Sequence, residues 1–198
     1  MERYRLTANS EPLTAASLQA LFTREALMLL LLVRHAQAAE QDATRYPDDS
    51  LRPLVSKGKK AQARISKELR RRKLIPTRVY SSPWKRAWQT ARILLEETGL
   101  PKSARIACEP LAAPPDLAAI AAQVGGGSAV GAVGGVGEDE IIALVGHEPW
   151  MSELAALLLT GRAGGLSVAF PKSGVMGIET PALVAEPGAA TLRFFLVP

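Results

Sequence analysis

The stretch Leu29-Leu30-Leu31-Leu32-Val33-Arg34-His35-Ala36 decides the fold of this 198-residue chain. A continuous apolar run that ends in a polar pair is typical of a strand covered on both faces of a sheet. A second stretch, from Ile141 to His147, has the same plan: Ile-Ile-Ala-Leu-Val-Gly-His. The two stretches contain both histidines of the chain. Each histidine is therefore expected at the carboxyl end of a buried strand.

The remaining sequence alternates between strand and helix patterns. It predicts strands over 29–33, 78–81, 104–108, 141–145, 175–179 and 192–197, and helices over 56–73, 82–97, 116–124 and 150–160. Ser56, Ser82 and Asp116 are predicted N-caps, with Pro83 at the first helical position. Gly99 and Gly161 are predicted to end helices. The alternation favours an α/β fold, a three-layer α/β/α sandwich with a mostly parallel central sheet and the last two strands antiparallel at one edge.

Composition places the chain among ordinary globular proteins. Hydrophobic residues make up 47% and charged residues 22% of the sequence, which excludes a disordered, collagen-like or membrane-spanning chain. The single cysteine, Cys108, excludes an internal disulfide and fits a reducing compartment, so we expect a cytoplasmic location.

Residues 1–27 are predicted to form an N-terminal extension, disordered or with one short helix over 14–27, and residues 28–198 the functional domain. The apolar run from Ala26 to Val33 is too short to span a bilayer. Ala36-Gln37-Ala38 resembles a signal-peptidase site, but cleavage there would remove Arg34 and His35, so we interpret the run as a strand. Residues 125–137 are glycine-rich and predict a flexible loop.

A dense basic run underlies the net charge of +5. Such an excess attracts nucleic acid, anionic lipid or phosphorylated substrates. The simplest interpretation is a solvated helix face, and nucleic-acid binding is disfavoured because no aromatic residues are interleaved with the basic ones. The run consists of Lys57, Lys59, Lys60, Arg64, Lys67, Arg70, Arg71, Arg72 and Lys73.

A phosphate site is the chemistry that the strand ends favour. Ligands in open α/β sheets bind outside the carboxyl ends of the strands. A third predicted strand ends at Ser81-Ser82-Pro83, and Arg86 lies in the first turn of the helix that follows. A helix N-terminus and an arginine both suit a phosphate group. Arg34, His35, Arg86 and His147 are therefore predicted to meet around one phosphoryl group.

Four segments, in order, resemble the histidine phosphatase superfamily, the phosphoglycerate-mutase-like group, and within it the SixA-type phosphohistidine phosphatases. They are LVRHAQA from residue 32, RPLVSKGKKAQA from 52, VYSSPWKRAWQTA from 79 and LVGHEPWMSEL from 144. The resemblance implies a phosphoglycerate mutase-like fold. It implies His35 as nucleophile, Arg34 and Arg86 as phosphate-binding arginines, and His147 as the second histidine. Ala36 stands where many members have glycine.

The resemblance leaves the proton donor open. Larger members carry a carboxylate between the counterparts of Arg86 and His147, where this chain offers Glu109 and Asp116 without a clear match. Glu109 and Asp116 are the candidate donors, or else a strand-end charge and a helix cap. Glu148 is a candidate to orient His147 or an ordinary turn residue. Expelling an alkoxide needs a general acid more than expelling an imidazole does.

The sequence therefore predicts a metal-independent phosphatase with no cofactor, working through a phosphohistidine on His35. The expected substrate is phosphohistidine in a protein. The alternatives are a phosphatase for small phosphomonoester metabolites and, with less support, a non-catalytic phosphate-binding module. Neither nucleic acid nor a membrane is an expected partner.

Overall fold

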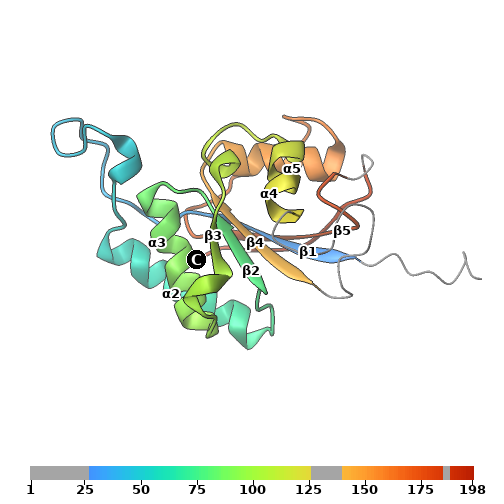
Figure 1. Cartoon of the computed structure of the whole chain (residues 1–198), viewed down its shortest axis with the longest axis horizontal. Coiled ribbons are helices and arrows are strands. Elements are labelled where there is room, and N and C mark those ends of the chain that lie inside the picture. The colour runs from blue at the N-terminus through green and yellow to red at the C-terminus, as the bar shows by residue number, and fades with distance from the viewer. Residues whose placement is uncertain (1–26, 126–139, 185–187) are drawn as a thin grey trace, which may run out of the picture.

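A mixed sheet between two pairs of helices forms the protein (Figure 1). The computed structural model describes residues 27–125, 140–184 and 188–198. Within them the strands are β1 (Met28–Arg34), β2 (Arg78–Ser81), β3 (Arg105–Ala107), β4 (Ile141–Gly146), β5 (Val175–Thr180) and β6 (Thr191–Leu196). The α-helices are α2 (Ser56–Arg71), α3 (Lys85–Thr98), α4 (Leu117–Gly125) and α5 (Trp150–Thr160). Short 3₁₀ helices are η1 (Asp49–Leu51), η2 (Lys102–Ala104) and η3 (Glu109–Ala112).

The sheet has the strand order β3-β2-β4-β1-β5-β6 in the described part of the chain. The first four strands in this order run parallel. Strand β5 is antiparallel to β1, and β6 is antiparallel to β5. The predicted mostly parallel sheet with an antiparallel pair at one edge is confirmed.

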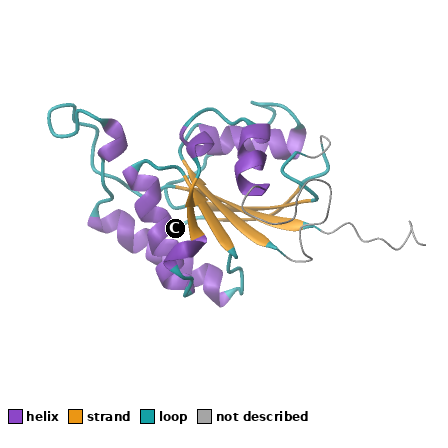
Figure 2. Ribbon diagram, in the orientation of Figure 1, coloured by secondary structure: helices purple, strands orange, loops and turns teal. Residues whose placement is uncertain are grey.

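Strand β1 is buried on both faces, which explains its continuous apolar sequence. Leu30 and Leu32 belong to a core cluster that includes α4 and α5 residues. Leu31 and Val33 belong to the opposite cluster, with α2 and α3 residues. Figure 2 shows the two helix layers on either side of the strands. The predicted three-layer sandwich is therefore confirmed.

Two predicted N-caps, Ser56 and Ser82, are wrong. Ser56 is the first residue of α2, and the cap position belongs to Val55, which offers no side-chain cap. Helix α3 begins at Lys85 rather than at Pro83, with Trp84 as its cap residue. The Ser82 hydroxyl accepts a bond from the Trp84 amide, but it also contacts a histidine described below. Ser82 and Pro83 therefore belong to the turn between β2 and α3, and not to the helix itself.

Other boundaries agree with the sequence. Gly99 and Gly161 end α3 and α5 in the left-handed conformation, where glycine carries no Cβ penalty. Asp116 accepts a bond from the Ala119 amide at the start of α4. The extension over 1–27 and the glycine-rich segment 125–137 fall, but for Leu27 and Gly125, outside the described residues. No helix in the described ranges is both long enough and apolar enough to cross a bilayer.

Gly58 fixes the start of α2 against the loop that leaves β1. A Cβ on Gly58 would lie 2.1 Å from the Gln37 carbonyl oxygen and 2.8 Å from the Gln37 amide nitrogen. These are backbone atoms two residues after His35, so they cannot move aside without displacing that segment. The contact therefore holds α2, the helix that carries the basic run, against the segment that follows His35.

Replacing Gly58 with alanine is expected to destabilise the protein by about 1–3 kcal/mol, because overpacking outweighs the gain in helix propensity. Urea unfolding measures the difference. Gly125→Ala is the matched control: it has nothing within 4 Å of its added Cβ and is expected to change stability by less than about 0.5 kcal/mol. Equal stability of the two variants would contradict the close contact.

Candidate active site

The parallel pairing of β1 with β4 brings the two histidines together. Arg34 pairs with Gly146 in the register, so His35 and His147 follow at the same edge of the sheet. The His35 amide donates to the Gly146 carbonyl at 2.9 Å. The two imidazole centroids lie 5.1 Å apart, with both side chains buried.

His35 is held as a neutral imidazole with one defined tautomer. Its Nδ1 lies 2.7 Å from the Ala36 carbonyl oxygen, and since a carbonyl can only accept, Nδ1 must carry the proton. The Nε2 atom therefore bears the free electron pair. Burial is the main cause that lowers the pKa of His35 to about 3; the Ala36 carbonyl opposes the shift, and the charges of Arg86, Arg34 and Lys172 contribute to it. The ring is uncharged near pH 7.

His147 is held by a serine from the neighbouring strand end. Its Nε2 lies 2.9 Å from the Ser82 hydroxyl, and Ser82 is completely buried at the end of β2. Burial, together with smaller contributions from His35, Arg86 and Arg52, lowers the pKa of His147 to about 2. Its Nδ1 is buried and has no partner among the described residues. The sequence assigned Ser82 only to helix capping, so this contact is new.

Two tryptophans surround His147. The Trp84 ring lies 4.8 Å from the imidazole centroid, and the Trp150 ring meets it edge-on at 6.0 Å. Trp84 is the cap residue of α3 and Trp150 the first residue of α5, and the sequence predicts both as packing residues beside the site. Their aromatic surface desolvates the imidazole and keeps it uncharged.

Arg86 is buried and reaches the same group of side chains. Its guanidinium lies 4.5 Å from the centroid of the Trp84 ring, a cation–π contact. Its Nη1 donates to the Asp49 backbone carbonyl at 2.8 Å and lies 3.0 Å from the Asp49 carboxylate. Burial lowers the pKa of Arg86, while the charge of Asp49 raises it.

Asp49 holds a second arginine as well. The Arg52 Nε lies 2.9 Å from the Asp49 carboxylate, and Arg52 also donates to the Ala39 carbonyl at 2.9 Å. Burial raises the pKa of Asp49, but the hydrogen bond from Arg52 and the charges of Arg86 and Arg52 outweigh it, and the pKa falls below its usual value. Sequence reasoning missed Asp49; its signal was its place three residues before Arg52.

Arg34 is the last residue of β1, and its charge acts on His35. Its side chain donates to the Phe170 carbonyl and is half-buried. Burial lowers the pKa of Arg34, and the charge of Glu148 raises it. The Ser173 amide donates to the Arg34 carbonyl at 3.2 Å, which places the neighbouring Lys172 near His35, where its charge lowers the histidine pKa.

Among the described residues, none of the candidate carboxylates forms a hydrogen bond or an ion pair with His35 or His147. Glu109 is exposed at the start of η3, and none of the hydrogen bonds or ion pairs in the described ranges joins it to His35 or His147. Asp116 caps α4. Glu148 accepts a bond from the Ser152 hydroxyl at 2.7 Å, so it stabilises the first turn of α5. The role of Glu109 as proton donor therefore stays a prediction.

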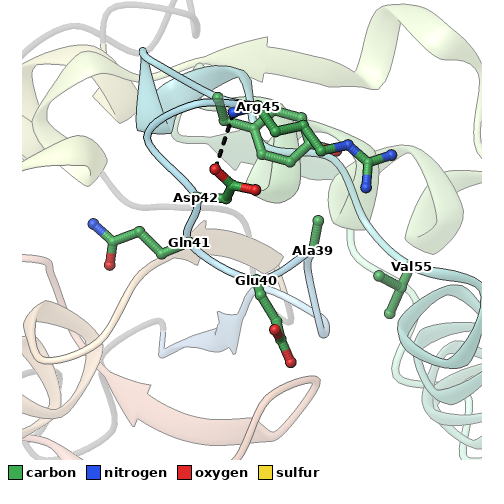
Figure 3. A pocket seen from close by; sticks show the side chains of 7 residues that line it. Ala39, Glu40, Gln41, Asp42, Arg45 and Val55 are labelled. Atoms are coloured by element: carbon green, nitrogen blue, oxygen red, sulfur yellow. Dashed lines mark hydrogen bonds between the residues drawn. The ribbon is translucent and has the colours of Figure 1, made fainter.

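A hollow on the loop between β1 and α2 is lined by residues other than those of the candidate active site. Figure 3 shows the Asp42 carboxylate bonded to the Arg45 amide. The Arg45 guanidinium lies over the ring of Tyr46, 5.4 Å from its centroid. The lining contains neither His35 nor His147, and none of Arg34, Arg52 and Arg86. It consists of Ala39, Glu40, Gln41, Asp42, Arg45, Tyr46 and Val55.

The group as a whole is cationic. Two neutral imidazoles have their pKa values lowered by four cations, Arg34, Arg52, Arg86 and Lys172. The Asp49 carboxylate pairs with two of these cations, Arg52 and Arg86. Such a set suits a phosphoryl dianion, whose oxygens arginine can grip in pairs. In the part of the chain that the structure describes, no group of three or more histidine, cysteine or acidic side chains could hold a metal ion.

Comparison with known proteins agrees with this chemistry. The model of the histidine phosphatase superfamily (branch 1) matches residues 30–107, which confirms the resemblance seen in the sequence. No curated protein matches the chain.

Solved structures share the fold over most of the chain. The protein histidine phosphatase SixA, solved with tungstate, is 24% identical, with a TM-score of 0.66 over 85% of this chain and 96% of its own. A protein from Nakamurella multipartitia that carries the SixA name is 25% identical, with a TM-score of 0.59 over 87% and 96%. A mycobacterial glucosyl-3-phosphoglycerate phosphatase is 18% identical, with a TM-score of 0.56 over 84% and 97%. The fold is phosphoglycerate mutase-like, and the family match supports a phosphatase.

The depressed histidine pKa values predict a loss of stability in acid. Between the folded value near 3 and the ordinary value of 6.5, the unfolded chain binds the proton that folded His35 does not. The free energy of unfolding therefore falls as the pH drops through this window, and His147 adds to the effect.

Urea unfolding at pH 7 and pH 4.5 measures this dependence, with a His35→Gln/His147→Gln variant as reference for all other titrating groups. We expect the wild-type protein to lose more stability than the variant on acidification. The same loss in both proteins would show that the histidines do not stay neutral in the fold.

Proposed function

We propose that this chain is a phosphatase that works through a covalent phosphohistidine on His35 and acts on phosphohistidine in a protein. The observation that carries the proposal is the orientation of His35. Its Nδ1 proton is committed to the Ala36 carbonyl, its Nε2 pair is free, and its ring lies 5.1 Å from that of His147. A neutral imidazole with a defined free nitrogen, surrounded by cations, is an activated nucleophile.

In the first step the His35 Nε2 electron pair attacks phosphorus in line with the leaving group. The N–P bond forms as the bond from phosphorus to the leaving atom breaks, and that atom keeps the bonding pair. The imidazole becomes cationic, and the Ala36 carbonyl stabilises its Nδ1 proton. Arg34, Arg86 and His147 bind the equatorial oxygens, which carry the negative charge of the transition state.

In the second step water attacks the phosphorus of the phosphohistidine. The new O–P bond forms as the N–P bond breaks, and the electron pair returns to His35 Nε2. One proton of the water passes to the released phosphate or to solvent. The side-chain cations neutralise the phosphoryl charge throughout, so the proposed mechanism needs no metal.

The proposed substrate class follows from the leaving group. An imidazole leaving group can depart with its own proton, whereas an alkoxide needs a general acid. The carboxylates of Asp49, Asp116 and Glu148 are engaged by arginines or helix starts, and Glu109 is exposed. This distribution supports a phosphoramidate over an ester. If small phosphomonoesters are the substrate instead, Glu109 is the proposed donor.

His35→Ala is expected to abolish phosphate release and acid-labile labelling of the protein, because His147, the second of the chain's two histidines, has its Nε2 engaged by the Ser82 hydroxyl. Incubation with phosphoramidate, followed by mapping of the labelled residue, measures this directly. The variants His35→Ala and Glu109→Gln are compared on a phosphohistidine peptide and on small phosphomonoesters, with EDTA present.

We expect Glu109→Gln to keep full activity on the peptide. Label on a residue other than His35 would overturn the mechanism. Wild-type turnover confined to esters, and lost in Glu109→Gln, would establish the alternative substrate class. Phosphate binding without turnover of any substrate would establish a binding module.

Ser82→Ala is expected to lower kcat about tenfold, because it leaves His147 Nε2 without its partner and frees the imidazole to rotate. Ser81→Ala is the control. Ser81 is also buried, but its hydroxyl donates to the Ser82 carbonyl rather than to a histidine. Steady-state kinetics on the phosphohistidine peptide should show the loss in Ser82→Ala alone, with Ser82→Thr restoring part of the rate. Equal kcat in both alanine variants would contradict the positioning role.

A further inference from the structure

The basic residues of α2 fall into two groups that differ in their ion pairs. In the C-terminal part of the helix, which we call its paired half, Lys67 pairs with Glu97, while Arg71 and the cap residue Arg72 both pair with Glu68. Arg70 in this part donates to the Glu97 backbone carbonyl at 3.5 Å. From Lys57 to Arg64, the exposed cations have no ion pair within the described residues. We call this group the α2 basic patch; it consists of Lys57, Lys59, Lys60 and Arg64.

Helix stability does not explain the α2 basic patch. The positive end of the helix dipole lies at the N-terminus, where acidic residues are favourable and basic ones unfavourable. The first turn of α2 has no acidic residue, and Val55 provides no side-chain cap. Lys57 and Lys59 therefore stand where their charges oppose the dipole. Departures from local stability rules are concentrated at functional positions.

The helix that carries the α2 basic patch packs against the segment that follows His35. Gly58, between two of its lysines, packs directly against the backbone of Gln37, two residues after His35. The surface is hollowed beside it, and Lys57, Lys60 and Arg64 line the hollow together with Ala61. A macromolecule whose phosphoryl group reaches His35 would place neighbouring surface over these cations.

We propose that the α2 basic patch docks an acidic surface of the phosphoprotein substrate beside its phosphohistidine. This inference rests on the proposed function and specifies how the protein substrate is chosen. Unpaired cations beside a catalytic centre raise the rate of productive encounter with an acidic partner and fix its orientation. Helix α2 contains no aromatic residue on which bases could stack, which favours a protein over single-stranded nucleic acid.

The test compares two triple variants with the same change in charge. Lys57→Gln/Lys60→Gln/Arg64→Gln removes three charges from the α2 basic patch. Lys67→Gln/Arg71→Gln/Arg72→Gln removes three charges from the paired half of the same helix. Two substrates are used: a small acidic protein phosphorylated on one histidine, and an uncharged peptide that carries one phosphohistidine.

We expect the patch variant to raise KM for the acidic protein about tenfold at low salt, with kcat and all peptide kinetics unchanged. The difference should shrink at 0.5 M salt, where screening is strong. The paired-half variant should keep the wild-type KM for both substrates.

The outcomes separate this inference from the proposed function. Wild-type protein that hydrolyses neither substrate overturns the proposed function and the docking surface with it. Wild-type protein active on both substrates, with an unchanged KM in the patch variant, overturns the docking surface alone. Equal increases of KM in both triple variants also overturn it, because net charge would then suffice. Duplex DNA binding lost in the patch variant, with KM for the acidic protein unchanged, would assign the patch to nucleic acid instead.

Discussion

The parallel pairing of β1 with β4 is the constraint on which the rest of the site depends. It sets Arg34 opposite Gly146, and the bond from the His35 amide to the Gly146 carbonyl continues the ladder by one residue. Side chains alternate between the faces of a strand, so a slip of one residue would move an imidazole to the other face. Because the run on β1 is apolar on both faces, the polar pair Arg34-His35 at its end opposes the slip: a shift of the strand would draw it between the two helix layers, where burying polar groups is costly.

The same burial that fixes the register sets the charge state of the histidines. Removing an imidazole from water disfavours its protonated form, and nearby guanidinium groups disfavour it further. His35 and His147 are therefore neutral while the residues around them are cationic. The positive charge of the site belongs to the arginines and Lys172, which cannot act as nucleophiles at neutral pH, and the free electron pair belongs to His35. In the proposed mechanism, charge stabilisation and nucleophilic attack are thus divided between different side chains.

Asp49 balances this positive charge. It binds both Arg86 and Arg52 from the short helix η1 on the β1–α2 loop. Without it, two buried or half-buried guanidinium groups would repel each other beside two uncharged rings. A phosphoryl dianion would share these arginines with Asp49, so the carboxylate orients them for the substrate. The same loop passes Gln37 and ends at α2, which connects the charge of the pocket to that of the outer helix surface.

The sequence by itself determined the strands, the parallel core of the sheet and the residues on which the proposed chemistry rests, because buried strands and their polar ends have a clear local pattern. The family match and the shared fold agree with that part. Only the tertiary structure decided that Ser82 contacts His147 instead of capping a helix, that Asp49 holds two arginines, and that Trp84 and Trp150 enclose an imidazole. These contacts join residues 3 to 65 positions apart in the chain. Their geometry depends on how the loops cross the sheet edge, which no local pattern of side chains encodes.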